Sequence, residues 1–263
     1  MIERSSIHRI CSGQVIVDLR SAVKELVENG LDAGASSISV LLEDGGFQRI
    51  QVVDNGVGIG PQDFKAIGLK HYTSKLRTFE QLSDGVDSLG FRGEAISSLC
   101  ALSRSLEITT RRADDVNGVR LIYDRNGVLQ ETQVTSHPCG TTVEVKELFQ
   151  PAPVRLESYR KRHRRELNQV ITLMQDYAIA RPEVTFRLVG DSYRPVQSIS
   201  TRFGRPKDRG IETESNRSSQ TVSKTLLTTS GRGTMKEAIL AVFGVQQVAS
   251  LEKFCFKSDS DIR

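Results

Sequence analysis

Three polar residues of one segment, Glu25, Asn29 and Asp32, stand four and then three positions apart. In an α-helix this spacing places them on one face, side by side. Carboxylate and amide oxygens in such a row can bind Mg²⁺, and a carboxylate can take a proton from water. A solvated polar face is the alternative interpretation, but few of the lysines that usually balance exposed acids are nearby. The trio therefore predicts a site that handles a metal ion and a water molecule.

Two glycine-rich segments indicate a ligand with a flat ring and a phosphate. Residues 54–58 (DNGVG) follow a strand-like run, and ligands often bind where a strand ends. There Asp54 could accept a hydrogen bond from an exocyclic amine while the glycines let the ring approach the backbone; a plain turn is the alternative. Residues 90–95 (GFRGEA) open a helix whose first N–H groups could bind phosphate, unless they form only a glycine-capped turn. The hydroxyl and ammonium groups that could join the same phosphates are those of Thr73, Ser74 and Lys75.

The hydrophobic pattern predicts the elements that position these residues. A helix over residues 14–31, with Ser12 as a possible N-cap and Gly34 at its end, would carry the polar trio. Strand-like runs over 37–42 and 49–53, joined by Asp44-Gly45-Gly46, predict a hairpin. Shorter helices are expected over 62–69 and 93–102, with a flexible crossing segment without a clean period at 71–90. The remaining elements are expected as strands over 106–111, 118–123, 128–134, 141–145 and 184–189 and as a long helix over 155–180.

This order of elements predicts an α+β fold in which helices cover one face of a mixed sheet, over residues 1–199. Residues 200–233 are polar and poor in apolar side chains, so we expect a flexible insertion or linker there. Residues 234–263, with a helix near 235–243 and a strand at 248–256, are too few for a core of their own. They would begin an incomplete second, transducer-like domain.

Composition excludes several classes of protein. The chain has 263 residues, with 36 Lys and Arg against 32 Asp and Glu, a formal net charge of +4. No apolar run approaches the roughly 18 residues of a membrane span, and the N-terminus lacks the apolar centre of a secretory signal, so we expect a soluble intracellular protein with no membrane partner. The four cysteines form no CxxC or Cys/His cluster, which argues against a zinc site and favours reduced thiols.

One segment is more basic than the whole chain. Residues 155–165 hold six cationic side chains and one glutamate, so their charge is 6 − 1 = +5. A solvated helix face is the alternative, but a phosphate backbone would neutralise the cluster and release counterions. We therefore expect non-specific, salt-sensitive binding of DNA. The candidate DNA-binding residues are Arg155, Arg160, Lys161, Arg162, Arg164 and Arg165.

Taken together and in this order, with Gly140-Thr141-Thr142-Val143 closing the series, these motifs resemble the GHKL ATPase superfamily, which has a Bergerat-type ATP-binding sandwich. The segments KELVENGLDAGA, DNGVGI, KHYTSK and GFRGEA are similar to the MutL mismatch-repair family. GFRGEAISSLCALS, together with IHRICSGQV near the start and Pro153-Val154-Arg155, resembles its eukaryotic PMS-type branch. The resemblance covers about residues 5–190.

The resemblance implies a role for each matching residue. Glu25 would be the general base that orients water, Asn29 would coordinate Mg²⁺, and Asp54 would accept the adenine amino group. Asp32 would support the base pocket, which Gly58 and Thr141 complete. The phosphate-contacting turn would contain Gly90, Arg92, Gly93 and Glu94, and the lid over ATP would contain Thr73, Ser74 and Lys75.

The resemblance also implies cofactors, partners and a location. ATP and Mg²⁺ would be bound, with slow hydrolysis coupled to dimerisation through the N-terminal part. The partners would be a second MutL homologue in a heterodimer, a MutS-type mismatch-recognition complex and DNA, all in the nucleus.

Two departures from the family pattern bear on this expectation. Gly30 stands where serine is common, and the family's second domain supplies a lysine for the γ-phosphate that no residue here matches. The alternative is therefore a truncated nucleotide- and DNA-binding regulatory module that no longer hydrolyses ATP. A histidine-kinase ATP domain is disfavoured by the GFRGEA turn and by the lack of a membrane segment.

Overall fold

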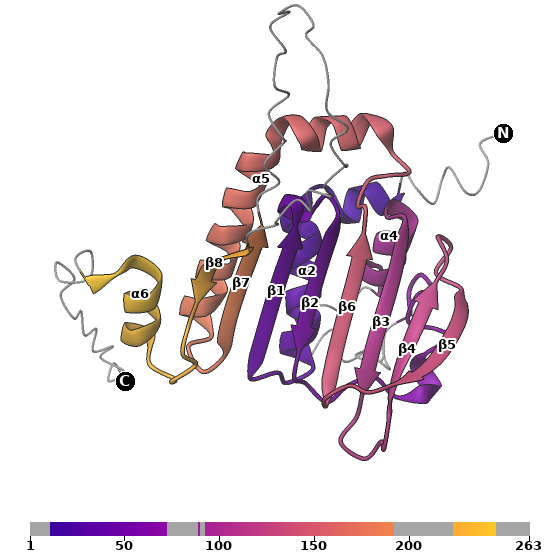
Figure 1. The fold of residues 1–263 in the computed structure, drawn as a ribbon, viewed down its shortest axis with the longest axis horizontal. Helices are drawn as coiled ribbons and strands as arrows, with labels where there is room; N and C mark the ends of the chain where they lie inside the picture. Colours follow the sequence, from indigo (N-terminus) through magenta and orange to yellow (C-terminus); the bar gives the residue numbers. More distant parts are fainter. Residues whose placement is uncertain (1–10, 73–88, 90–92, 192–222, 246–263) are drawn as a thin grey trace, which may run out of the picture.

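One sheet organises the molecule. The structure is a computed structural model that describes residues 11–72, 89, 93–191 and 223–245. Its strands run in the order β5-β4-β3-β6-β2-β1-β7-β8, and the β1–β7 pair is parallel whereas the other described pairs are antiparallel (Figure 1). The strands are β1 Ser37–Glu43, β2 Arg49–Asp54, β3 Ser105–Arg111, β4 Gly118–Tyr123, β5 Leu129–Thr135, β6 Gly140–Lys146, β7 Thr185–Asp191 and β8 Ser223–Thr228.

Helices cover one face of this sheet (Figure 1). They are α2 Leu19–Asp32, α4 Ala95–Leu102 and α5 Pro153–Ala180, while α6 Met235–Phe243 lies beside α5 and β8. Alternate strand residues such as Val40 and Ile50 are fully buried against helical residues such as Val23, and they form one core. The predicted α+β sandwich is therefore confirmed. Within the described residues, no helix combines the length and the apolar character that crossing a bilayer requires.

The helix that carries the polar trio begins later than its pattern predicts. Residues 11–15 are helical, but the chain leaves the helix at 16–18, and α2 starts after Asp18. The Asp18 side chain accepts the Ser21 N–H at 2.7 Å while the Ser21 hydroxyl accepts the Asp18 N–H at 2.9 Å, which makes a capping box. This reciprocal pair makes Asp18 the N-cap of α2, so the prediction of one helix over 14–31 capped by Ser12 is wrong at its start.

The end of α2 follows the prediction. Gly34 has φ +71°, a left-handed conformation that glycine adopts without strain. The Ala35 N–H donates to the Gly30 carbonyl at 3.1 Å and the Gly34 N–H to the Leu31 carbonyl at 2.9 Å, the two bonds of a Schellman motif. This ending turns the chain sharply into β1.

Two other expectations differ from the structure. The predicted helix over 62–69 is a short 3-10 helix, Pro61–Asp63, followed by turns. Strand β8 lies inside the polar segment 200–233, because pairing with β7 and burial of Leu227 compensate for the exposure of its polar residues. The prediction of a linker is therefore wrong for 223–228. The rest of that segment up to residue 222 and the expected strand at 248–256 lie outside the described residues.

The face of the sheet away from the helices carries charged side chains. Glu107 on β3, 8% exposed, accepts a hydrogen bond from Lys146 on β6 at 2.6 Å and one from the Arg120 Nε on β4 at 3.1 Å. Burial on its own raises the pKa of Glu107, but the two cations outweigh burial, and the pKa lies below its ordinary value. The ionised carboxylate therefore links three strands.

Candidate active site

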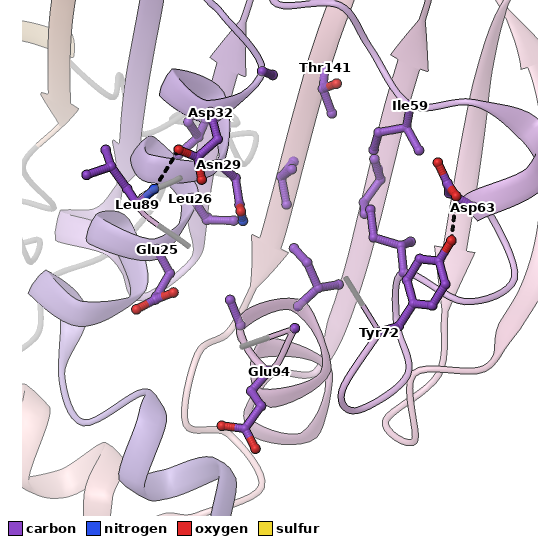
Figure 2. Close-up of a pocket in the computed structure, with 18 of the residues that line it drawn as sticks. Glu25, Leu26, Asn29, Asp32, Ile59, Asp63, Tyr72, Leu89, Glu94 and Thr141 are labelled. Atoms are coloured by element: carbon purple, nitrogen blue, oxygen red, sulfur yellow. Dashed lines mark hydrogen bonds between the residues drawn. The ribbon is translucent and has the colours of Figure 1, made fainter. Parts of the chain in front are cut away.

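A cavity of about 930 Å³ opens between α2, the end of β2, the start of β6 and the start of α4. Figure 2 shows side chains from α2 on one side of it and Thr141, Asp63 and Tyr72 across from them. Eight of the residues predicted from the sequence line this cavity: Glu25, Asn29, Asp32, Asp54, Gly58, Gly93, Glu94 and Thr141. The structure therefore brings residues of four separate sequence motifs to one place.

The polar trio projects from one side of α2, as its spacing predicts (Figure 2). Asp32 Oδ1 accepts the backbone N–H of Leu89 at 2.8 Å, which ties the end of the helix to the segment before α4. The Glu25 carboxylate is partly exposed to the cavity and lies 3.9 Å from the Lys24 ammonium. The α2 wall thus presents carboxylate and amide oxygens.

Asp54 lines the cavity beside α2, where a Cβ on Gly30 would lie 3.2 Å from the Asp54 Cβ. It is the last residue of β2 and pairs with Thr141 at the start of β6. Burial raises the pKa of Asp54 above its ordinary value, and hydrogen bonds from the backbone of Gly56, at 2.9 Å, and of Thr141 oppose this shift. A half-buried acceptor at the end of a strand suits a ligand amine.

The glycine loop after Asp54 is pressed against neighbouring backbone. Gly58 has φ +74°, and a Cβ there would lie 2.5 Å from the carbonyl oxygen of Arg111. The Ile59 N–H donates to the Thr110 hydroxyl at 2.9 Å, and that hydroxyl lies 3.1 Å from the hydroxyl of Thr141. The loop therefore needs glycine at position 58 and is fixed onto β3 and β6.

The start of α4 forms another wall. Gly93 has φ +62°, and a Cβ there would lie 2.3 Å from the carbonyl oxygen of Tyr72, so these two segments touch. Glu94 follows as the N-cap residue, with its carboxylate 3.6 Å from the His71 ring. Because the first N–H groups of a helix attract anions, this wall is suited to phosphate. The predicted residues Thr73, Ser74, Lys75, Gly90 and Arg92 lie outside the described residues.

Several lining residues had not been predicted. The Tyr72 hydroxyl donates to Asp63 at 2.5 Å, and both side chains line the cavity with Ile59 and Ile67 (Figure 2). Asp63 was hidden because its segment was expected to be a helix. Tyr72 lies within the KHYTSK motif and could have been found from its position beside Thr73.

None of the basic residues 155–165 lines the cavity. The cationic residues between 160 and 165 are exposed, whereas Arg155 donates to the Gly13 carbonyl at 2.8 Å and the Ile16 carbonyl at 3.1 Å. The Arg155 guanidinium is therefore occupied by this chain's own backbone. The Tyr159 hydroxyl donates to Gly45 in the β1–β2 turn at 2.9 Å. Asp54 is at the other end of β2, so Tyr159 and Asp54 lie at opposite ends of that strand.

The cavity thus combines oxygen ligands on α2, a helix N-terminus for an anion and a half-buried acceptor for an amine. Among the residues that the structure describes, no three His, Cys, Asp or Glu side chains are grouped so that they could hold a metal ion by themselves.

A family model for "Histidine kinase-, DNA gyrase B-, and HSP90-like ATPase" matches residues 17–148, which are 132 of the 263 residues and include α2, the end of β2 and the start of α4. The chain belongs to this ATPase family. Within the family it is a MutL/PMS-type GHKL ATPase domain, as the following relatives show.

Curated relatives match along the whole chain. DNA mismatch repair protein PMS1 of Arabidopsis thaliana is 40% identical over 262 residues, covering 100% of this chain and 25% of that protein. Mismatch repair endonuclease PMS2 of Homo sapiens is 38% identical over 260 residues, covering 99% of this chain and 27% of that protein. The chain thus spans about a quarter of the length of these relatives.

Solved structures of this GHKL type share the fold. The N-terminal domain of a DNA repair protein superposes with a TM-score of 0.74 at 34% identity, covering 94% of this chain and 62% of that one. The Aquifex aeolicus MutL ATPase domain complexed with ADP has a TM-score of 0.56 at 26% identity, covering 84% and 66%.

Proposed function

We propose that this chain binds ATP with Mg²⁺ and hydrolyses it slowly as the nucleotide-driven module of a mismatch-repair protein. The observation that supports this most is that Glu25 and Asn29, from α2, and Asp54, from the end of β2, line one cavity. The names of the PMS1 and PMS2 relatives support the role in mismatch repair.

The proposed chemistry follows from where the side chains lie. Asp54 accepts a hydrogen bond from the adenine amino group, and the start of α4 receives the phosphates. Asn29 offers an amide oxygen to Mg²⁺, which, when bound, neutralises phosphate charge. Glu25 takes a proton from water as the water oxygen bonds to the γ-phosphorus and the β,γ-bridging oxygen leaves with ADP.

The test compares nucleotide binding and steady-state hydrolysis for the wild type, Glu25→Gln and Asn29→Ala. Glu25→Gln keeps ATP affinity and loses turnover by at least about 100-fold, the lower range for a general base. Asn29→Ala loses Mg²⁺-dependent affinity. Glu131→Gln, on the exposed surface of β5, is the matched control and stays at wild-type levels. Unchanged turnover in both site variants contradicts the assignment, and wild-type binding without turnover supports the regulatory-module alternative.

We further propose that residues 160–165 bind DNA without sequence preference. Their exposure and their one-sign charge support this, because phosphates would relieve the repulsion between them. Arg160→Glu combined with Arg164→Glu weakens binding to duplex DNA and flattens its dependence on salt. Arg125→Glu combined with Lys224→Glu makes the same change of charge elsewhere and serves as the control. Equal affinity and salt slope in the two double variants would refute this interface.

The partners of this activity are proposals as well. A second MutL homologue in a heterodimer and a MutS-type mismatch-recognition complex are the partners that a PMS-type relative suggests. The eukaryotic relatives also support a nuclear location. Co-purification from nuclear extract with a tagged chain, followed by identification of the bound proteins, tests all three together.

A further inference from the structure

One buried carboxylate on α2 has no part in the proposed chemistry. Glu28 is 7% exposed. One of its carboxylate oxygens accepts a hydrogen bond from the Lys24 ammonium at 2.6 Å, and the other accepts one from the Tyr177 hydroxyl at 2.7 Å. Tyr177 is on α5, so this bond crosses between two helices that pack together. Burial raises the pKa of Tyr177, with the hydrogen bond to Glu28 adding to the effect, so the hydroxyl stays protonated and remains a donor.

The same ammonium also lies near the proposed general base. Lys24 Nζ is 3.9 Å from Glu25 but 2.6 Å from Glu28, so two carboxylates share one cation and Glu28 holds it more closely. A close cation stabilises the ionised form of a carboxylate and so makes it a weaker base. It would also occupy an oxygen that the attacking water needs. The distance between Lys24 and Glu25 therefore matters for hydrolysis.

We propose that Glu28, fixed by Tyr177, is a positioning residue that restrains Lys24 and keeps its ammonium from closing onto the Glu25 carboxylate. This inference rests on the proposed function of Glu25. A purely structural link between α2 and α5 is the competing explanation. The packing of the two helices already includes buried apolar residues such as Val27 and Val170, and a structural link needs no ammonium between two carboxylates.

The first variant is Glu28→Gln, which removes the charge that holds Lys24 while its amide oxygen can still accept from Tyr177. The ammonium then moves onto Glu25. In the nucleotide-free chain the ¹³C carboxyl signal of Glu25, assigned by its loss in Glu25→Gln, titrates at a pH lower by about one unit, from the Coulomb gain at a partly exposed pair. Turnover of ATP falls about tenfold, and the acid limb of its pH profile moves to lower pH.

The decisive variant combines Lys24→Met with Glu28→Gln. With no ammonium left, the Glu25 signal returns to the wild-type midpoint or above it, and turnover recovers relative to Glu28→Gln. A purely structural role predicts the opposite, since the double variant loses one more contact and recovers nothing. Tyr177→Phe removes only the hydroxyl and carries the same test if Glu28→Gln does not fold; it moves the midpoint in the same direction by a smaller amount.

The outcomes separate this inference from the function on which it rests. Full turnover in Glu25→Gln refutes the proposed role of Glu25. An inactive Glu25→Gln together with an unmoved Glu25 titration in Glu28→Gln and Tyr177→Phe refutes only the positioning role of Glu28. A lower midpoint that recovers in the double variant supports both.

Discussion

Asp54→Asn is the substitution that best separates binding from folding in this cavity. The side chain keeps its shape, and the oxygen that accepts the Gly56 N–H at 2.9 Å remains. What changes is the second oxygen, which becomes an NH₂ donor facing the adenine amine, itself a donor. The variant therefore loses a charged hydrogen bond to the base while the turn that follows β2 stays in place.

The expected loss of ATP affinity follows from the kind of hydrogen bond that Asp54→Asn removes. A hydrogen bond to a charged group contributes about 1.5–3 kcal/mol, so ATP affinity falls about 10- to 150-fold. The affinity for GTP falls less than the affinity for ATP, or rises, because guanine presents an acceptor oxygen where adenine presents the amine. The free energy of unfolding changes by less than about 1 kcal/mol, since the relief of a buried charge offsets the weaker bond to Thr141. Calorimetric titration with both nucleotides and urea unfolding measure these quantities.

The pH dependence of ATP affinity and of the unfolding free energy tests Asp54 in a second way. Because burial raises the pKa of Asp54 above 3.8, wild-type ATP affinity falls as the pH drops through that raised value, and Asp54→Asn lacks this fall. The folded chain also binds this proton more readily than the unfolded chain, so the unfolding free energy falls as the pH rises from 3.8 to the raised value. A parallel loss of affinity and stability in Asp54→Asn, with ATP and GTP affected equally, would refute the reasoning.

Two further substitutions test the frame around the site. Gly58→Ala combines left-handed strain of about 1–2 kcal/mol with a Cβ 2.5 Å from the Arg111 oxygen, so it lowers the melting temperature and ATP affinity. Gly233 has φ +81° and open space around it, so Gly233→Ala adds only the left-handed backbone strain and serves as the control. Equal losses of melting temperature and ATP affinity in the two variants would contradict this account. Glu107→Gln loses about 1 kcal/mol in urea unfolding at neutral pH, a value reduced for the partial exposure of its cations. Because the pKa of Glu107 is lowered in the folded chain, the difference in unfolding free energy between wild type and Glu107→Gln is fully present at a pH above the ordinary pKa of 4.5. It disappears as the pH falls through the pKa of the folded chain. A difference that persists in acid would show that the shape of the side chain, and not its charge, is responsible.

Local sequence patterns were sufficient to predict the elements that surround the cavity. The hairpin between β1 and β2 forms where Asp44-Gly45-Gly46 predicted it, because glycines take up positive φ angles in that turn. The polar trio lies along one side of α2 because the spacing of four and three residues matches the helical repeat. In both cases the deciding interactions occur within a few residues of the chain.

What the sequence did not reveal depends on residues that are far apart in the chain. Strand β8 forms because β7 offers it a free edge, and its own polar composition carries no such signal. The Glu28 carboxylate receives its hydrogen bond from Tyr177, 149 residues later, so its burial was not visible in the helical pattern. Asp63 reaches the cavity from the end of the short 3-10 helix that begins where a longer α-helix was expected. Tertiary contacts decided each of these positions.

Helix α5 links the two surfaces proposed for ligands. Its first half carries the exposed basic residues. Glu166 accepts a hydrogen bond from the Leu19 N–H at 3.1 Å, and Tyr177 donates one to Glu28, so α5 contacts α2 both at the first residue of α2 and in its second half. DNA bound at 160–165 would therefore act on a helix that also positions the wall carrying Glu25. If binding of DNA shifts α5, ATP must change DNA affinity by the same factor as DNA changes ATP affinity, because coupling between two sites is reciprocal. Tyr177→Phe should weaken both effects equally, whereas a coupling that runs through other elements would leave them unchanged.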